Sequence, residues 1–176
     1  LVLYETYLAT LHRVAPFADG PILAAQGNVA NMLVAVGRTN EALRCMREVH
    51  KTSKKMFGTD DERTIKAANN IIQALDHLER LDEVKTMARK QLQIATDALP
   101  PTHDIILTLR RQLAKALFMN KDASQANVRE AKGIFEDLTK TRRQIFGAAH
   151  PDTIMDQQLL DDLISLLPAS RGLRPV

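Results

Sequence analysis

The residues that could perform chemistry gather most densely in residues 145–153, where His150 and Asp152 lie two positions apart. Histidine beside a carboxylate is a combination used in general acid–base catalysis. The stretch has two degraded copies, at residues 57–62 and 99–104, which keep an apolar residue at the start and acidic or histidine residues at the end. Each copy ends one apolar-periodic run and begins another. We therefore interpret all three stretches as joints between helices and not as catalytic sites.

No other group of reactive side chains in the sequence is arranged like an active site. The five histidines are scattered, none is paired with the single cysteine, and none has the i, i+4 spacing of a helical metal site. The sequence also has no phosphate-binding glycine loop, no nucleophile elbow and no carboxylate pair on an expected cleft. It therefore predicts a protein that is not an enzyme and that has no catalytic residues, no metal and no cofactor.

An internal repeat organises the chain. Phe57, Leu99 and Phe146 occupy the same position of the three joints, and they are 42 and then 47 residues apart. A glutamate followed by a small apolar residue has the same two spacings, at positions 41, 83 and 130. A period of about 20–50 residues is typical of a solenoid, in which helical pairs stack because one pair cannot bury its apolar face alone.

The apolar periodicity predicts helices and gives no strand signal. Thr59 and Glu62 form a predicted capping box, and Thr102 is the predicted cap of a later helix. The turn over residues 120–129 is expected to hold the five additional residues by which 47 exceeds 42. Helices are expected over residues 1–15, 20–36, 40–57, 59–78, 81–99, 102–119, 130–146 and 151–167.

These helices predict a single repeat domain over residues 1–168. A lone second helix at its start and a lone first helix at its end would each leave an apolar face open. Since residue 1 is not Met and already lies in a helical pattern, we expect a fragment or a processed form. The expected divisions are a half-repeat at 1–15, repeats at about 19–57, 61–99 and 103–146, a half-repeat at 150–167 and a tail at 169–176.

Composition and charge are those of an ordinary globular protein. The hydrophobic content is 45% and the aromatic content only 4%, a mixture that favours helix over sheet. The net charge of +3 allows an acidic partner or an organelle interior but does not require nucleic acid. The single Cys45 excludes an internal disulfide and favours a reducing compartment, so we expect an intracellular protein, cytoplasmic or organellar. The uncharged run at residues 20–37 contains Gln26, Asn28 and Asn31, which argues against membrane insertion.

Taken together, these motifs resemble the 42-residue tetratricopeptide repeat of kinesin light chains. The last joint has the pattern Phe-Gly-x-x-His-Pro-Asp-Thr in full, Asn69 and Asn70 form the asparagine pair of a first helix, and the Glu-Ala marker lies in second helices. The final half-repeat departs from the pattern, with Leu159 in place of asparagine. The resemblance implies an all-α right-handed solenoid of stacked helix–turn–helix repeats.

In that family the first helices of successive repeats line a concave groove, and a peptide lies in it. The positions in each row are spaced i, i+3, i+7, which places them on one stripe of a helix. A carboxamide offers both a donor and an acceptor to an extended peptide backbone. The simpler interpretation is that these side chains only solvate an open surface. By position, the resemblance implies three rows of groove residues: Asn28, Asn31 and Ala35, then Asn70, Gln73 and His77, then Gln112, Lys115 and Met119.

Basic residues cluster on the second helices, which face the convex side in this type of repeat. We expect them to form a solvated outer face. Nucleic-acid binding through this face is disfavoured because the chain has few aromatic residues to stack on bases. Cys45 is expected to lie in the core. The basic residues are Arg44, Arg47, Lys51, Lys54, Lys55, Arg89, Lys90, Lys140, Arg142 and Arg143.

Three functional hypotheses follow. The first is a non-catalytic scaffold that binds a peptide or a partner subunit through its concave face. The second is a structural subunit of a large assembly, organellar or ribonucleoprotein. The third is the repeat segment of a larger multidomain protein whose activity lies in another domain.

Overall fold

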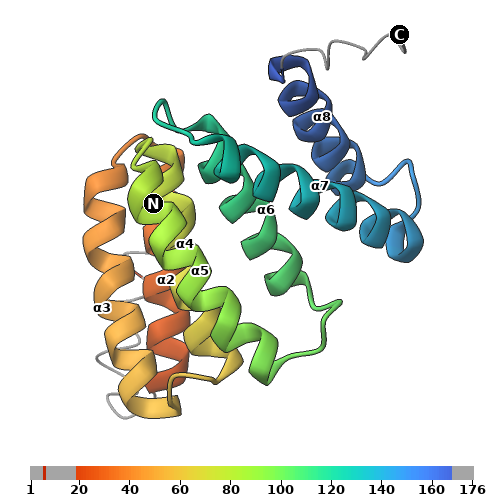
Figure 1. The fold of residues 1–176 in the computed structure, drawn as a ribbon. Coiled ribbons are helices and arrows are strands. Elements are labelled where there is room, and N and C mark those ends of the chain that lie inside the picture. The colour runs from red at the N-terminus through yellow and green to blue at the C-terminus, as the bar shows by residue number, and fades with distance from the viewer. Residues whose placement is uncertain (1–5, 7–18, 168–176) are drawn as a thin grey trace, which may run out of the picture.

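The computed structural model describes residue 6 and residues 19–167, and all regular structure in that part of the chain is α-helical. The all-α prediction is confirmed; the expected helix at residues 1–15, apart from residue 6, and the tail at 169–176 lie outside the described residues. The helices, drawn in Figure 1, are α2 (Asp19–Ala35), α3 (Thr39–Phe57), α4 (Glu62–His77), α5 (Leu81–Ala98), α6 (Asp104–Met119), α7 (Gln125–Phe146) and α8 (Pro151–Leu166).

The helices pack in a row, each against the next along the chain (Figure 1). The first helices of successive pairs also contact one another, α2 with α4, α4 with α6, and α6 with α8. The second helices are farther apart, because no Cα atom of α3 comes within 8 Å of a Cα atom of α5. The structure is therefore a solenoid that is closely packed along its first helices and open between its second helices.

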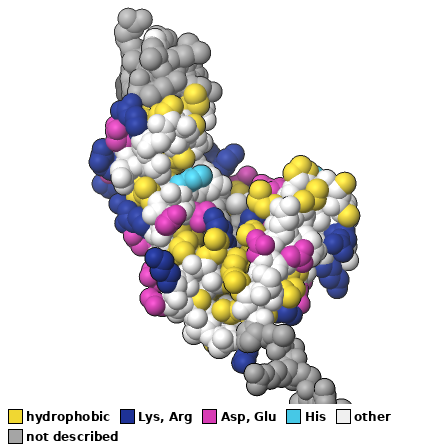
Figure 2. All heavy atoms as spheres, turned by 90° about the horizontal axis from the view of Figure 1, so that it is seen from above, with side chains coloured by type: hydrophobic (Ala, Val, Ile, Leu, Met, Phe, Trp, Pro, Cys, Tyr) yellow, Lys and Arg dark blue, Asp and Glu magenta, His cyan; other side chains and the backbone are white. Residues whose placement is uncertain are grey.

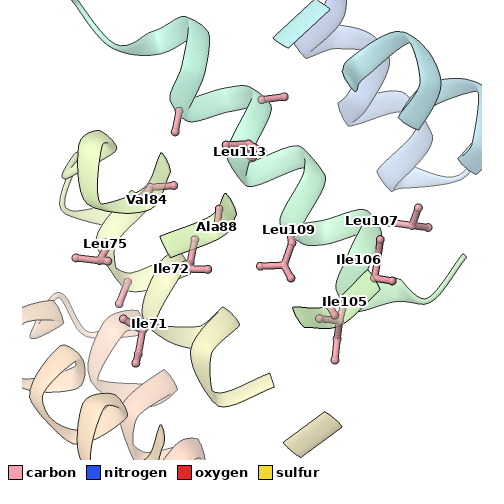
Figure 3. Packing of buried hydrophobic residues seen from close by; sticks show 14 of the residues in the cluster. Ile71, Ile72, Leu75, Val84, Ala88, Ile105, Ile106, Leu107, Leu109 and Leu113 are labelled. Atoms are coloured by element: carbon pink, nitrogen blue, oxygen red, sulfur yellow. The ribbon is translucent and has the colours of Figure 1, made fainter. Parts of the chain in front are cut away.

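The apolar residue that follows each of the three recurring glutamates, the marker glutamates, belongs to the core. Ala42, Val84 and Ala131, each of which follows a marker glutamate, are fully buried. Ile72 and Leu75 of α4 belong to the same apolar cluster as Val84 of α5 (Figure 3). A small side chain at the marker position lets a second helix approach its first helix closely, which explains why the marker recurs with the repeat.

Three equivalent joint residues cap the first helices. Asp61, His103 and His150 have extended backbones (ψ of 136°, 136° and 135°), and each side chain accepts a hydrogen bond from the backbone N–H two residues later. The predicted capping box of Thr59 and the predicted cap at Thr102 are therefore wrong. Helices α4 and α6 begin later than expected, at the point where the backbone lets a side chain reach a free amide, whereas α8 begins at Pro151 as predicted.

The predicted turn over residues 120–129 is also wrong. Helix α7 begins at Gln125, and the side chain of Ser124 caps it by accepting a hydrogen bond from the backbone N–H of Asn127 at 3.1 Å. Helix α7 has 22 residues, whereas α3 has 19 and α5 has 18. The additional residues therefore mainly lengthen a helix, and Ser124, a favoured N-cap residue, is the sequence signal that the prediction missed.

A buried ionic cluster joins α6, α7 and α8. Arg111 of α6 binds Asp152 at 2.8 Å and also pairs with Asp156, both on α8. Arg142 of α7 lies 3.0 Å from Asp152 and 3.3 Å from Asp156. Arg142 and Asp156 are fully buried. The expectation that Arg142 lies on a solvated outer face is wrong, because α8 packs over that end of α7 and covers it.

This cluster is the main polar anchor of α8. Burial opposes ionisation of Asp152, but the hydrogen bond and charge of Arg111 and the charge of Arg142 hold its pKa below the ordinary value. The apolar contribution of α8 to the core is small, since Leu160 and Leu163 are its only buried hydrophobic residues in the described part of the chain. The position of α8 therefore depends on charge pairing as much as on apolar burial.

We predict that Asp156→Ala lowers the free energy of unfolding by about 3–5 kcal/mol, because it removes the buried carboxylate that pairs with both Arg111 and Arg142 and leaves Asp152 alone to balance two arginines. Urea denaturation measures the loss, and hydrogen exchange should show α8 opening first. Asp162→Ala on the exposed side of the same helix is the control, with a change of about 0.5 kcal/mol or less. Equal effects of the two variants would contradict the role given to the cluster.

Candidate functional site

Three of the predicted polar residues line a cavity on the first-helix side of the molecule. The cavity has a volume of about 330 Å³ and is formed by α2, α3 and α4. Asn28 and Asn31 of α2 and Asn70 of α4 supply its carboxamides. This volume lies within the range of about 300–1,000 Å³ that is typical of ligand pockets.

A smaller cavity lies beside it, between the same three helices. Its volume is about 180 Å³, and it shares Asn31 and Asn70 with the larger one. Gln73 and His77 line it one and two turns further along α4. In the described part of the chain, the side chains of Asn28, Asn31, Asn70, Gln73 and His77 make no hydrogen bond or ion pair with other residues. We call the two adjacent cavities together the α2/α4 groove.

The third predicted row is arranged differently. The side chain of Gln112 is buried, with 8% of its surface exposed, and none of the described residues donates a hydrogen bond to its oxygen. Lys115 binds Asp76 of α4 at 2.7 Å and thereby links α6 to α4. Neither residue lines the α2/α4 groove.

The prediction missed the apolar and basic parts of the groove. Leu23, Val49 and Ala67 form a small apolar cluster against which Phe57 packs, and all four line the larger cavity. These residues lie on three helices, so no single stripe of the sequence reveals them. They give the groove a pocket for an apolar side chain.

Two basic residues complete the rim. Lys66 lies one turn before Asn70 on α4 and forms no ion pair with any described residue. Arg63 lies one turn earlier again, where its guanidinium sits 3.6 Å from the centre of the Phe57 ring and binds Asp61 at 2.8 Å. The hydrogen bonds from Arg63 lower the pKa of Asp61 to about 2. Extending the polar stripe of α4 toward its N-terminus would have located both residues.

The basic residues of the second helices do not form one positive surface. Arg47 pairs with Glu83, Arg89 pairs with Glu130, and Arg142 is buried. On the face shown in Figure 2, basic and acidic side chains are interspersed. This pattern is unlike the continuous basic stripe that tracks a nucleic-acid backbone.

The sequence from α2 to the start of α4 matches a known family. Residues 22–62 match the sequence profile of the tetratricopeptide repeat. This range contains the repeat formed by α2 and α3 and includes Asn28 and Asn31. The chain folds as a tetratricopeptide-repeat solenoid. The resemblance to the kinesin light chain type is confirmed by solved structures with the same arrangement of repeats.

Two of those structures are nearly identical TPR-like repeats assigned to a kinesin light chain of Podosopora anserina. One has a TM-score of 0.71 at 18% identity and the other 0.69 at 20%, and in both cases the match covers 80% of this chain and 64% of that chain. A third is BtubC (BKLC) from P. vanneervenii, with a TM-score of 0.72 at 15% identity over 91% of this chain and 61% of that one. This chain thus spans less than two thirds of each. No curated protein gave a match.

The described residues also limit the kind of site. Among the described residues, no three His, Cys, Asp or Glu side chains come together as metal ligands would. No helix in that part of the structure is long and apolar enough to cross a membrane. What the groove offers is hydrogen-bonding amides, a small apolar pocket and positive charge.

We predict that Gln112→Met raises the free energy of unfolding by about 1 kcal/mol, because it removes a buried oxygen that has no donor. The melting temperature and urea midpoint measure this change. Gln73→Met on the exposed part of α4 is the control, since its amide is free to bond to water, and its stability should stay unchanged. A loss of stability in the Gln112 variant would mean that its amide has a partner.

Proposed function

We propose that the chain is a protein-interaction scaffold that holds an extended segment of a partner protein in the α2/α4 groove. The tetratricopeptide repeat fold is in general a scaffold for protein interaction, and this supports a non-catalytic role. The observation that carries the proposal is that Asn31 and Asn70 line two adjacent cavities. They lie where a segment running along the groove would pass.

The chemistry of the groove suits a peptide backbone. An extended chain exposes N–H and C=O groups, and each carboxamide can both donate to and accept from them. The five polar side chains of α2 and α4 that have no partner among the described residues would hold the backbone with little dependence on its sequence. The pocket between Leu23, Val49 and Phe57 would take an apolar side chain, and Lys66 at the rim would favour an acidic neighbour.

The exposed apolar face of α8 favours a second candidate, lateral contact within a larger assembly. Ile154, Met155 and Ile164 are each nearly half exposed, and Leu166 is 72% exposed. Several large apolar side chains exposed on one surface helix are a common mark of a protein contact. Under this hypothesis, Ile154→Glu with Ile164→Glu would prevent assembly and leave groove binding unchanged.

We predict that Asn31→Ala with Asn70→Ala weakens binding of a groove peptide at least about tenfold, since each lost hydrogen bond contributes about 1 kcal/mol. The peptide is one selected by display on the unmodified chain, and fluorescence anisotropy gives its Kd. Asn40→Ala with Gln158→Ala, which removes two exposed carboxamides outside the groove, is the matched control. Equal affinity of the two double variants would show that the peptide binds elsewhere.

A further inference from the structure

A larger cavity lies on a different face of α4 from the groove. Its volume is about 570 Å³. The apolar floor is formed by Ile71 and Leu75 of α4 (labelled in Figure 3), and Met87 of α5 adds to it. The walls are the second helices α3 and α5. The groove stripe of α4, which contains Asn70 and Gln73, does not contribute to this cavity.

The cavity follows from the way the solenoid packs. Since α3 and α5 do not approach within 8 Å of each other between Cα atoms, side chains alone must fill the space between them. They do so at one end, where Arg47 of α3 reaches Glu83 of α5 at 3.7 Å. Along the rest of the interval the space stays open.

The two ends of the cavity differ in charge. At the α5 N-terminal end, both carboxylates already have partners: Asp82 binds Lys85 and Asn120, and Glu83 binds Arg80 as well as Arg47. At the other end, His50 and Lys90 line the cavity and form no ion pair in the described part of the chain. The basic end is therefore the one that lacks a counter-charge.

The immediate neighbours of His50 confirm that positive charge concentrates there. Burial is the largest cause that lowers the pKa of His50, and the charges of Lys54 and Lys90 lower it further. Lys54, like Lys90, has no acidic partner among the described residues. A carboxylate placed between these groups would gain two charge interactions and would favour the charged form of His50.

A buried amide also lines the cavity without a partner. Gln91 of α5 is 5% exposed, and no described residue donates a hydrogen bond to its side-chain oxygen. A buried acceptor of this kind costs about 1–3 kcal/mol unless a donor reaches it. An occupant of the cavity with a backbone or side-chain N–H would supply that donor.

We propose that the space between α3 and α5 is a second docking site, which takes a segment of a partner protein with a large apolar side chain next to a carboxylate. The apolar side chain would cover Ile71, Leu75 and Met87, and the carboxylate would lie between His50 and Lys90. A nucleic acid fits less well, because Asp82 and Glu83 line the same cavity and no aromatic side chain in it could stack on a base. The site is separate from the α2/α4 groove and does not depend on it.

The test uses N-acetyl-phenylalanyl-glutamate amide as a minimal probe and follows the full chain by NMR. We expect the Met87 methyl and His50 ring signals to shift and saturate together, and the pKa of His50 to rise, because the bound carboxylate favours the charged imidazole. The corresponding glutamine probe should bind about tenfold more weakly, because it lacks the charge. If the Met87 and His50 signals do not saturate, or if the two probes bind equally, the proposal is wrong.

Two matched pairs of variants locate the binding. Thr86→Trp fills the cavity and should abolish binding, whereas Thr96→Trp on the same helix should not; both threonines are exposed and donate to the carbonyl four residues earlier. Lys90→Glu should weaken binding about tenfold or more, and Lys51→Glu, with the same change in charge outside the cavity, should have a small effect. Binding that survives Thr86→Trp would overturn the proposal.

The same spectra test binding at the α3/α5 site and binding in the α2/α4 groove separately. Lys66→Glu changes the rim of the groove and should leave the Met87 and His50 shifts unchanged. Shifts of the Asn70 side-chain amide report on the groove in the same spectra. A probe that shifts the NMR signal of the Asn70 side-chain amide and leaves that of the Met87 methyl unchanged would refute the second site and support the groove.

Discussion

The closer packing of the first helices than of the second helices is the constraint on which the rest of the structure depends. Helices α2, α4, α6 and α8 contact one another in succession, whereas α3 and α5 do not meet. Contact between α2 and α4 places Asn31 next to Asn70 and creates the groove. The separation of α3 and α5 creates the second cavity, the one between these two helices over Ile71 and Leu75. Helix α4 takes part in both because its polar and apolar stripes face in different directions.

The sequence was sufficient for features that recur with the repeat. The spacing of Phe57, Leu99 and Phe146 gave the fold class and most helix ends, because each joint must break one apolar-periodic run and start another. The same register selected Asn31 and Asn70, which the structure brings together. Periodicity did not identify Asp61, His103 and His150 as the capping residues. It placed the caps one or two residues away in two of the three joints, because the exact position depends on backbone angles that periodicity does not determine.

The sequence was insufficient where tertiary contacts override the repeat pattern. Arg142 belongs to a run of basic residues that reads as solvent-exposed, yet α8 buries it against Asp152 and Asp156. Gln112 occupies the register of Asn70, yet it is buried, while Lys115 is held by Asp76. The pocket of Leu23, Val49 and Phe57 comes from different helices. In each case a residue from a distant part of the chain decides the environment.

The most direct test of the groove is an isotope-edited NOE experiment on the chain with a bound peptide selected by display. Binding along α2 and α4 predicts NOEs from backbone amides of the peptide to the side-chain amides of both Asn31 and Asn70, and from one apolar side chain of the peptide to Phe57. NOEs confined to α6, α7 and α8, with none to Asn31 or Asn70, would contradict the assignment of the groove as the binding site.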